Sequence, residues 1–191
     1  MYMIASPNLG KSETEALRTL ISTFNTLYQA RLNTVIAGGA VEPLYQPADA
    51  EHEFNTIYFT RDYFASALHE IAHWCIAGDQ RRKRVDYGYW YAPDGRDASQ
   101  QALFERVEVK PQAIEWILSR SCGHKFRLSA DNLEGDAQPS ATFRKQVCAQ
   151  AKSYCTGGLP THALELVGAF SQVFGLPSPL IPEHYEEAAL T

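Results

Sequence analysis

Residues 62–78 read DYFASALHEIAHWCIAG, an apolar run that carries two histidines. A helix turns by about 100° per residue, so His69 and His73 lie on one face, roughly 6 Å apart along the helix axis. The other apolar residues of the run surround this helix almost completely, which indicates that the helix is buried. We therefore predict a central helix from about Arg61 to Ala77, closed by Gly78.

The pattern His-Glu-x-x-His is typical of a metal site. Two imidazoles on one helix face can bind the same ion, and neutral imidazole suits zinc, iron, copper and nickel. Glu70 lies about 80° from the midline of the histidine pair, close enough to act on a water bound to the metal. We predict His69 and His73 as metal ligands and Glu70 as a catalytic residue.

A catalytic metal site also needs a third protein ligand and open positions for water, dioxygen or substrate. Glu105 and Glu108 lie on the next long predicted helix, 32 to 35 residues after His73. They are one helical turn apart, so one can bind the metal while the other supports a ligating histidine. We predict Glu108 as the ligand, with Glu105 as the alternative.

Two imidazoles and one carboxylate are found both in hydrolytic zinc enzymes and in Fe(II) oxygenases. With zinc, Glu70 is expected to act as general base on the bound water. With iron, the same residue is expected to orient water or substrate, because the metal and O₂ supply the oxidising power. Ligand spacing alone leaves both chemistries open.

The composition is that of a single soluble domain spanning residues 1–191, with 45% hydrophobic and 20% charged residues and a net charge of −5. This charge does not indicate a uniformly basic nucleic-acid-binding protein, and we do not expect nucleic acid as a partner. The start lacks a basic leader, and no run approaches the ~20 apolar residues of a membrane span. We expect a cytoplasmic protein without membrane association.

Positive charge gathers after the predicted metal-binding helix, at the run Arg81-Arg82-Lys83-Arg84. Such a run beside a site is consistent with an acidic docking partner, although a solvated loop is an equally good interpretation. Residues 84–92 follow as a predicted strand rich in aromatic residues. We predict that Arg81, Arg82, Tyr87, Tyr89 and Trp90 bind substrate, with ordinary strand packing as the alternative for the aromatic side chains.

The remaining elements are predicted from periodicity and capping. Ser12 and Glu15 form a capping-box pattern before a helix over residues 13–32. Gly38-Gly39 is interpreted as a chain break, after which Val41–Tyr45 and Thr56–Thr60 are predicted as strands. A helix that opens at Ser99 is strained or interrupted by Pro111. Further predictions are a short strand over Lys125–Ser129 and helices over residues 142–154 and 161–174.

Several segments together resemble one known family. They are residues 66–78 with the metal motif, Arg81-Arg82, VDYGYWY at 85–91 and QALFERVEVKPQA at 101–113. This combination is far more diagnostic than His-Glu-x-x-His alone, and it is similar to the bacterial elongation factor P hydroxylase family over nearly the whole chain.

The resemblance implies hydroxylation of the β-lysylated lysine of translation elongation factor P. It implies a two-His-one-carboxylate centre at His69, His73 and Glu108, with Fe(II) as the metal, O₂ as co-substrate and a reductant, although purified protein can carry another divalent ion such as zinc. It also implies an α+β fold of helices on a small mixed sheet, similar to that of the metal-dependent endoribonucleases of ribosome maturation. The alternative function is a zinc-dependent peptidase or endoribonuclease that uses Glu70 as general base.

Overall fold

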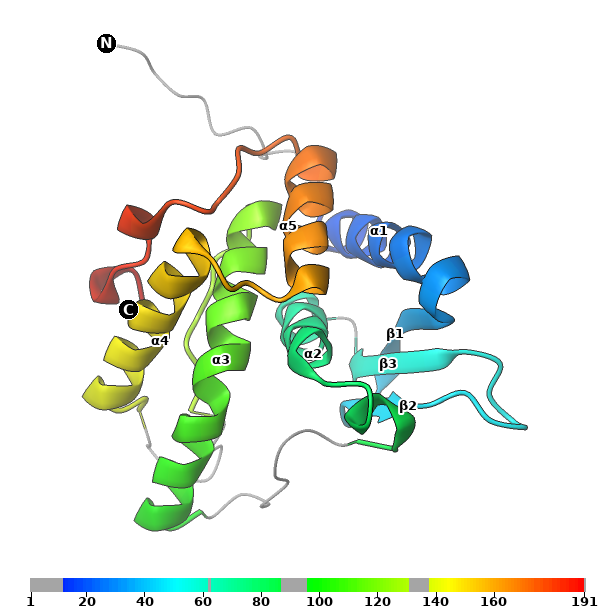
Figure 1. Cartoon of the computed structure of the whole chain (residues 1–191), viewed down its shortest axis with the longest axis horizontal. Coiled ribbons are helices and arrows are strands. Elements are labelled where there is room, and N and C mark those ends of the chain that lie inside the picture. Colours follow the sequence, from blue (N-terminus) through cyan, green and yellow to red (C-terminus); the bar gives the residue numbers. More distant parts are fainter. Residues whose placement is uncertain (1–11, 62, 87–95, 131–137, 191) are drawn as a thin grey trace.

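The computed structural model describes residues 12–61, 63–86, 96–130 and 138–190. Within these ranges, the structure has five α-helices and a three-stranded sheet that lies at one edge of the molecule, with α1 and α2 against it and α3, α4 and α5 beyond α2 (Figure 1). The helices are α1 (Glu13–Leu32), α2 (Phe64–Ile76), α3 (Ala98–Cys122), α4 (Ala141–Thr156) and α5 (Thr161–Phe174). The predicted α+β architecture is confirmed, whereas its likeness to ribosome-maturation endoribonucleases stays a prediction. None of the helices that the structure describes is both long and apolar enough to cross a bilayer.

The sheet is mixed, with strand order β1-β3-β2. Strand β1 (Thr34–Ala40) runs parallel to β3 (Asn55–Thr60), and β2 (Leu44–Gln46) runs antiparallel to β3. The prediction of one strand over 41–45 was wrong, because β1 precedes it and β2 only begins at Leu44. Gly39 does not break the chain: with φ of 88° it lies where the register of β1 shifts, as in a bulge that favours glycine.

Helix α2 is shorter than predicted at both ends. It starts after Tyr63, whose extended backbone forms the N-cap, and Arg61 before it has a positive φ of 49°. At the other end Ala77 is extended and its N–H bonds back to the carbonyl of His73, so the helix ends before Gly78. The predicted closure by glycine is therefore wrong, and the two histidines lie in the last two turns of the helix.

Helix α3 is continuous over 25 residues, so the predicted interruption at Pro111 does not occur, whereas the alternative of strain there stays a prediction. Proline removes one backbone hydrogen bond, but α3 packs against α2, α4 and α5, and these contacts hold the helix together. The predicted strand over residues 125–129 does not form. Instead, the side chain of Gln112 bonds both the N–H and the carbonyl of Ser129, at 3.0 and 2.9 Å, in place of a neighbouring strand.

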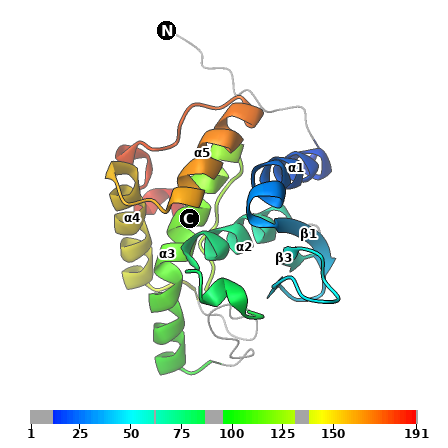
Figure 2. The ribbon, with the colours of Figure 1, turned by 45° about the vertical axis from the view of Figure 1, so that its right-hand side comes forward.

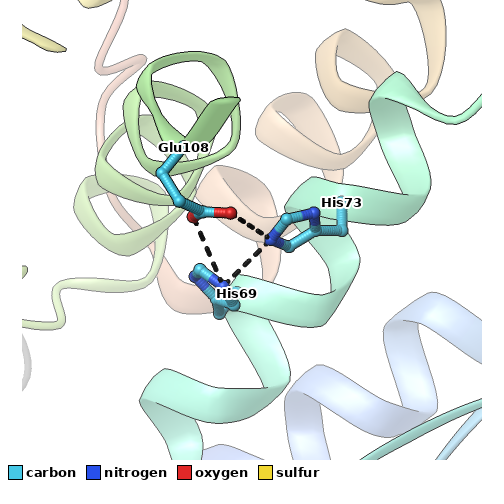
Figure 3. Close-up of side chains that lie close together, drawn as sticks. All are labelled: His69, His73 and Glu108. Carbon is cyan, nitrogen blue, oxygen red and sulfur yellow. Dashed lines mark hydrogen bonds and ion pairs between the residues drawn. The ribbon is translucent and has the colours of Figure 1, made fainter. Parts of the chain in front are cut away.

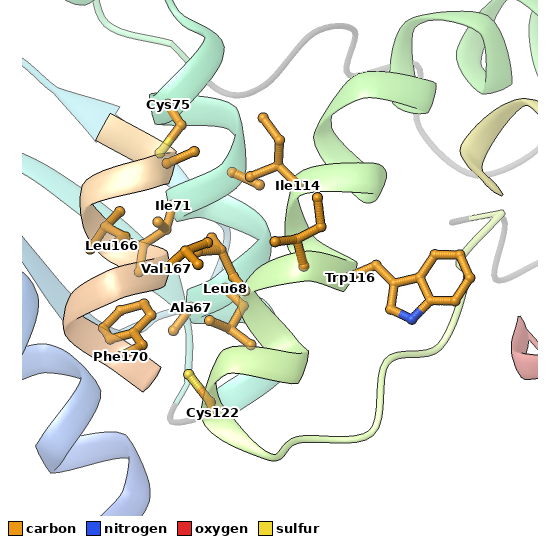
Figure 4. Packing of buried hydrophobic residues seen from close by; sticks show 14 of the residues in the cluster. Ala67, Leu68, Ile71, Cys75, Ile114, Trp116, Cys122, Leu166, Val167 and Phe170 are labelled. Carbon is orange, nitrogen blue, oxygen red and sulfur yellow. The ribbon is translucent and has the colours of Figure 1, made fainter. Parts of the chain in front are cut away.

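Helix α2 lies at the centre of the hydrophobic core, between the sheet and helices α3 and α5 (Figures 1 and 2). Its residues Ala67, Leu68 and Ile71 have no accessible surface, and they pack against Ile114 of α3 and Phe170 of α5 (Figure 4). This confirms that α2 is a buried central helix. Contacts with the sheet, α3 and α5 therefore hold α2 and its polar side chains in place.

A short 3₁₀ turn, η1 (Arg81–Lys83), follows α2. Three residues after this turn, Asp86 forms a bridge to the sheet, in which Tyr45 and Asp86 exchange backbone hydrogen bonds of 2.7 and 3.0 Å. The rest of the predicted aromatic strand, including Tyr87, Tyr89 and Trp90, lies outside the described residues. The predicted helices over 142–154 and 161–174 are confirmed as α4 and α5.

Candidate metal centre

Helix α2 presents His69 and His73 on one face, as their spacing predicts. Their Nε2 atoms are 3.0 Å apart, and their ring centroids are 4.6 Å apart (Figure 3). Both rings are fixed on a helix that is packed on three sides, so little conformational freedom is left for them to lose when they bind a common ligand. The pair is therefore preorganised for one ion.

Helix α3 supplies the carboxylate of Glu108, which is only 3% exposed. Its Oε1 lies 3.3 Å from Nε2 of His73, and its Oε2 lies 3.7 Å from Nε2 of His69. One ligand atom from each of the three residues lies within 4.8 Å of the others. In the part of the chain that the structure describes, this is the one cluster of three such groups with ligand atoms this close together.

The distances within this cluster fit a shared ion. Two atoms that each lie about 2.1 Å from one metal are about 3.0 Å apart at a 90° bond angle and about 3.4 Å apart at the tetrahedral angle. The 3.0 Å between His69 and His73 and the 3.3 Å between His73 and Glu108 match these values, whereas the 3.7 Å between His69 and Glu108 is longer and needs a wider bond angle, of about 124°. A set of two imidazoles and one carboxylate suits iron and zinc, and it leaves other coordination positions open.

Glu115 supports one of the histidines from behind. Its Oε2 lies 2.8 Å from Nδ1 of His69 and is an acceptor for the Nδ1 proton. When His69 gives up its other proton, the lone pair of Nε2 therefore faces His73 and Glu108. We predicted that Glu105, one turn from Glu108, would support a ligating histidine. Glu115, two turns beyond Glu108, does so instead. A spacing of seven places two residues on nearly the same helix face, so the Glu108–Glu115 spacing was the available signal.

Glu105, the alternative ligand, lies elsewhere. Its two carboxylate oxygens accept hydrogen bonds from the backbone N–H and the hydroxyl of Ser140, at 2.9 and 2.5 Å. Ser140 is the N-cap of α4. The structure thus brings Glu108, and not Glu105, to the histidines, because residues three apart on a helix point about 60° away from one another.

The electrostatics of the cluster favour a cation. Burial by itself raises the pKa of Glu108, but the hydrogen bond from His73 and the charges of both imidazoles outweigh it and hold the pKa at about 2. Burial likewise opposes protonation of His69, yet Glu115 and Glu108 raise its pKa to about 10. The cluster therefore attracts positive charge, and a metal ion would compete with the proton of His69 because it binds the neutral imidazole.

A small pocket opens beside the cluster. His73 and Glu70 line it from α2, and the predicted substrate-binding residues Arg81 and Arg82 line it from the turn η1. Burial raises the pKa of Glu70 above its usual value, although the nearby imidazoles oppose the shift. The pocket thus joins the candidate metal centre to the basic turn.

These features define a class of protein: an α+β scaffold with a two-His-one-carboxylate candidate metal centre between two packed helices. Comparison with known proteins narrows the class. The family model for elongation factor P hydroxylase (EpmC) matches residues 23–185, and this chain belongs to that family. It is 48% identical to the elongation factor P lysine hydroxylase of Haemophilus influenzae over 147 residues, which cover 77% of this chain and 83% of that protein.

Proposed function

We propose that this protein is a single-domain enzyme that hydroxylates a lysine side chain of translation elongation factor P. Membership of the elongation factor P hydroxylase family supports the substrate and the reaction. The observation that carries the chemistry is the cluster of His69, His73 and Glu108, because hydroxylation of an unactivated C–H bond needs a redox-active centre. A substrate that acts in translation would place the enzyme in the cytoplasm.

We propose Fe(II) as the native metal and O₂ as the oxidant. Zinc has no redox chemistry and so cannot activate O₂, although it suits the same ligands. In the overall reaction one oxygen atom of O₂ enters the C–H bond, and the other leaves as water after taking two electrons from a reductant and two protons. When bound, the metal would supply the activation of O₂, which no side chain of the cluster can provide.

The residues of the chain have separate tasks in this proposal. His69, His73 and Glu108 hold the ion, and Glu115 fixes the tautomer of His69 so that Nε2 is free to bind. Glu70 borders the pocket next to His73, where a substrate side chain would enter. With a redox metal, Glu70 has no need to act as the general base that a hydrolase would require.

We propose further that the target lysine already carries a β-lysyl group. Such a side chain is a long flexible arm, and the pocket beside His73 is the place where its end would approach the cluster. Arg81 and Arg82 at the far side of the pocket lie on the same turn as Lys83 and Arg84, where the body of the substrate protein would dock.

Intact-mass analysis of elongation factor P tests the proposal. Elongation factor P from cells that lack this protein is expected to lose the mass of one oxygen atom on its lysylated lysine peptide. The wild-type chain should restore that mass, and His73→Ala should not. A hydroxylated peptide that persists in the deletion cells would contradict the proposal.

Metal analysis separates the hydroxylase from a zinc hydrolase. Protein purified without chelator is expected to contain iron, by elemental analysis and by anomalous scattering at the iron and zinc edges. Cleavage of casein or RNA by the zinc-loaded protein, abolished by Glu70→Gln, would support the hydrolase instead.

A further inference from the structure

A row of side chains that are easily oxidised leads away from the candidate metal centre through the core. Trp74 directly follows the predicted ligand His73 on α2 and is only 4% exposed. Its ring lies against that of Tyr28 from α1, with centroids 4.9 Å apart, and Tyr28 has no accessible surface. The Tyr28 hydroxyl donates to Glu165 of α5 at 3.0 Å. The contacts therefore run from the centre to a carboxylate side chain that is 32% exposed.

Tyr28 is placed to lose an electron and a proton together. Tryptophan and tyrosine are among the side chains that lose an electron most readily, and electrons pass easily between rings in contact. A phenol that has lost an electron is a strong acid, so its proton must have an acceptor. Oε2 of Glu165 is within reach for direct proton transfer from the Tyr28 hydroxyl. Oxidation of Tyr28 therefore leaves no positive charge buried on its ring.

The surroundings of the two rings favour oxidation of Tyr28 over lasting oxidation of Trp74. The Arg82 guanidinium lies over the Trp74 ring, 4.4 Å from its centroid, and repels a positive charge there. The indole Nε1–H is buried and has no acceptor among the residues that the structure describes. Arg31 also lies over Tyr28, at 5.2 Å, but the tyrosyl radical is neutral once Glu165 has taken the proton.

A second tryptophan–tyrosine pair in the core differs in its proton acceptor. The rings of Trp116 and Tyr185 are also buried and also 4.9 Å apart. The Tyr185 hydroxyl, however, donates to the backbone carbonyl of Pro179, and a carbonyl is a far weaker base than a carboxylate. Ring contact is thus common to both pairs, whereas the carboxylate belongs to the pair beside the candidate metal centre.

We propose that Trp74 and Tyr28 carry single electrons from the protein surface to the candidate metal centre. The relay rests on the proposed function, in which the metal becomes an oxidant by reaction with O₂. The oxidised centre takes one electron from Trp74, and Tyr28 replaces this electron while its proton moves to Glu165. A small one-electron reductant at the surface, such as ascorbate, then returns the electron to Tyr28, and Glu165 returns the proton. In sum, the reductant loses one electron and the centre gains it.

The relay has its main use when O₂ reacts and no substrate lysine is present. An oxidised centre without substrate attacks the side chains around it, and the imidazoles of His69 and His73 lie closest. Electrons delivered through Trp74 and Tyr28 discharge the centre before this damage occurs.

The test uses full-length, iron-loaded protein without elongation factor P, mixed with hydrogen peroxide and frozen for electron paramagnetic resonance. Wild type is expected to show a tyrosyl radical. Tyr28→Phe should remove this signal, and Trp74→Phe should remove most of it, because phenylalanine is much harder to oxidise. Glu165→Gln, which keeps a polar contact but is no base, should lower its yield. The matched control Tyr185→Phe should leave the signal unchanged.

A second readout is the damage that the protein does to itself. After repeated additions of peroxide, peptide mass analysis should find that His69 and His73 gain oxygen faster in Tyr28→Phe than in wild type. Ascorbate should slow this gain in wild type and have little effect in Tyr28→Phe. A tyrosyl signal that persists in Tyr28→Phe, or equal damage in the two proteins at equal iron content, would overturn the relay.

Failure of the relay and failure of the proposed function give different results. If elongation factor P is hydroxylated but no radical forms at Tyr28, the relay alone is wrong. If neither O₂ nor peroxide changes the oxidation state of the bound iron, the redox centre of the proposed function is wrong, and the relay falls with it.

Discussion

Two polar clusters of this molecule combine imidazoles with carboxylates, and they differ in how their charges are satisfied. The first, here called the metal cluster, contains two imidazoles and one carboxylate whose ligand atoms face one another. A second carboxylate is hydrogen-bonded to one of the imidazoles. No lysine or arginine forms an ion pair with it in the described chain. Its members are His69, His73, Glu108 and Glu115.

The second, here called the α1–α5 cluster, joins the first helix to the last long one. Glu165 accepts two hydrogen bonds from Arg31, at 3.0 and 2.6 Å, and one from the Tyr28 hydroxyl at 3.0 Å. His162 lies 3.4 Å from the same carboxylate. Both oxygens of this carboxylate thus accept hydrogen bonds from within the protein.

The contrast shows why only one of the clusters is a candidate metal site. Both glutamates have a pKa held at about 2: that of Glu165 by the hydrogen bond from Arg31, and that of Glu108 by imidazoles that outweigh the effect of its burial. The α1–α5 cluster balances its negative charge with a fixed guanidinium and so has no need of a metal. The metal cluster has only imidazoles, which bind either a proton or a metal.

Removal of one ligand should have the largest effect. His73→Ala is expected to lose the metal and to lower hydroxylation at least about a hundredfold, because two ligands cannot replace three. Elemental analysis and the mass of elongation factor P measure both quantities. Arg31→Met, in the α1–α5 cluster, is the control and should keep full metal content; full occupancy in His73→Ala would refute the assignment of the metal cluster.

Metal binding should stabilise the fold only through the metal cluster. At an ion concentration of 100 times Kd the expected gain is about 2.7 kcal/mol, which corresponds to a rise in Tm of roughly 5 to 10 °C for a chain of this size. Calorimetry of metal-free and metal-loaded protein checks this. The rise should vanish in His69→Ala and persist in Arg31→Met, and an equal rise in both variants would locate the stabilising ion elsewhere.

Loss of the supporting carboxylate should have a smaller effect than loss of a ligand. Glu115→Gln is expected to weaken metal affinity by about 10 to 100-fold, because the hydrogen bond to His69 Nδ1 becomes weaker and the tautomer is less well fixed. Metal titration in competition with a chelator measures this change.

Glu105→Gln, on the same helix, is the matched control for Glu115→Gln. It should leave metal affinity unchanged and cost about 1 kcal/mol of stability, through the contact with Ser140 at the start of α4. If Glu105→Gln weakened metal binding more than Glu115→Gln, the roles assigned to these two carboxylates would be wrong.

The smallest effect is expected at the α1–α5 cluster, as a function of pH. Because the pKa of Glu165 in the folded protein is depressed to about 2, its stabilising contribution is present above its unfolded pKa of about 4.5 and is lost as the pH falls toward 2. Arg31→Met should therefore move the midpoint of acid unfolding upward, by less than about one pH unit since the pair is largely exposed. Circular dichroism across this pH range measures the shift, and an unchanged midpoint would show that the pair contributes nothing.

Local sequence signals, such as capping residues and apolar periodicity, predicted some elements of the fold but not others. The bounds of α1 were predicted because Ser12 caps it and its apolar residues repeat at helical spacing. Strand β1 was missed because its two glycines were interpreted as a break, whereas the parallel partner β3 holds them in a bulged strand. A residue such as Gln112, which bonds the backbone of a distant segment, leaves no periodic signal at all.

The sequence by itself determined that two imidazoles share a helix face and that a carboxylate on a later helix could complete a ligand set. These properties depend on the 3.6-residue period of a helix, which is the same wherever the helix lies. Only the tertiary structure decided that Glu108 rather than Glu105 meets the histidines, that Glu115 stands behind His69, and that Arg82 and Trp74 border the same pocket as Glu70. Those contacts depend on how the helices pack and on the backbone bridge that connects the segment after η1 to the sheet. Packing is determined by the whole core and not by any one segment.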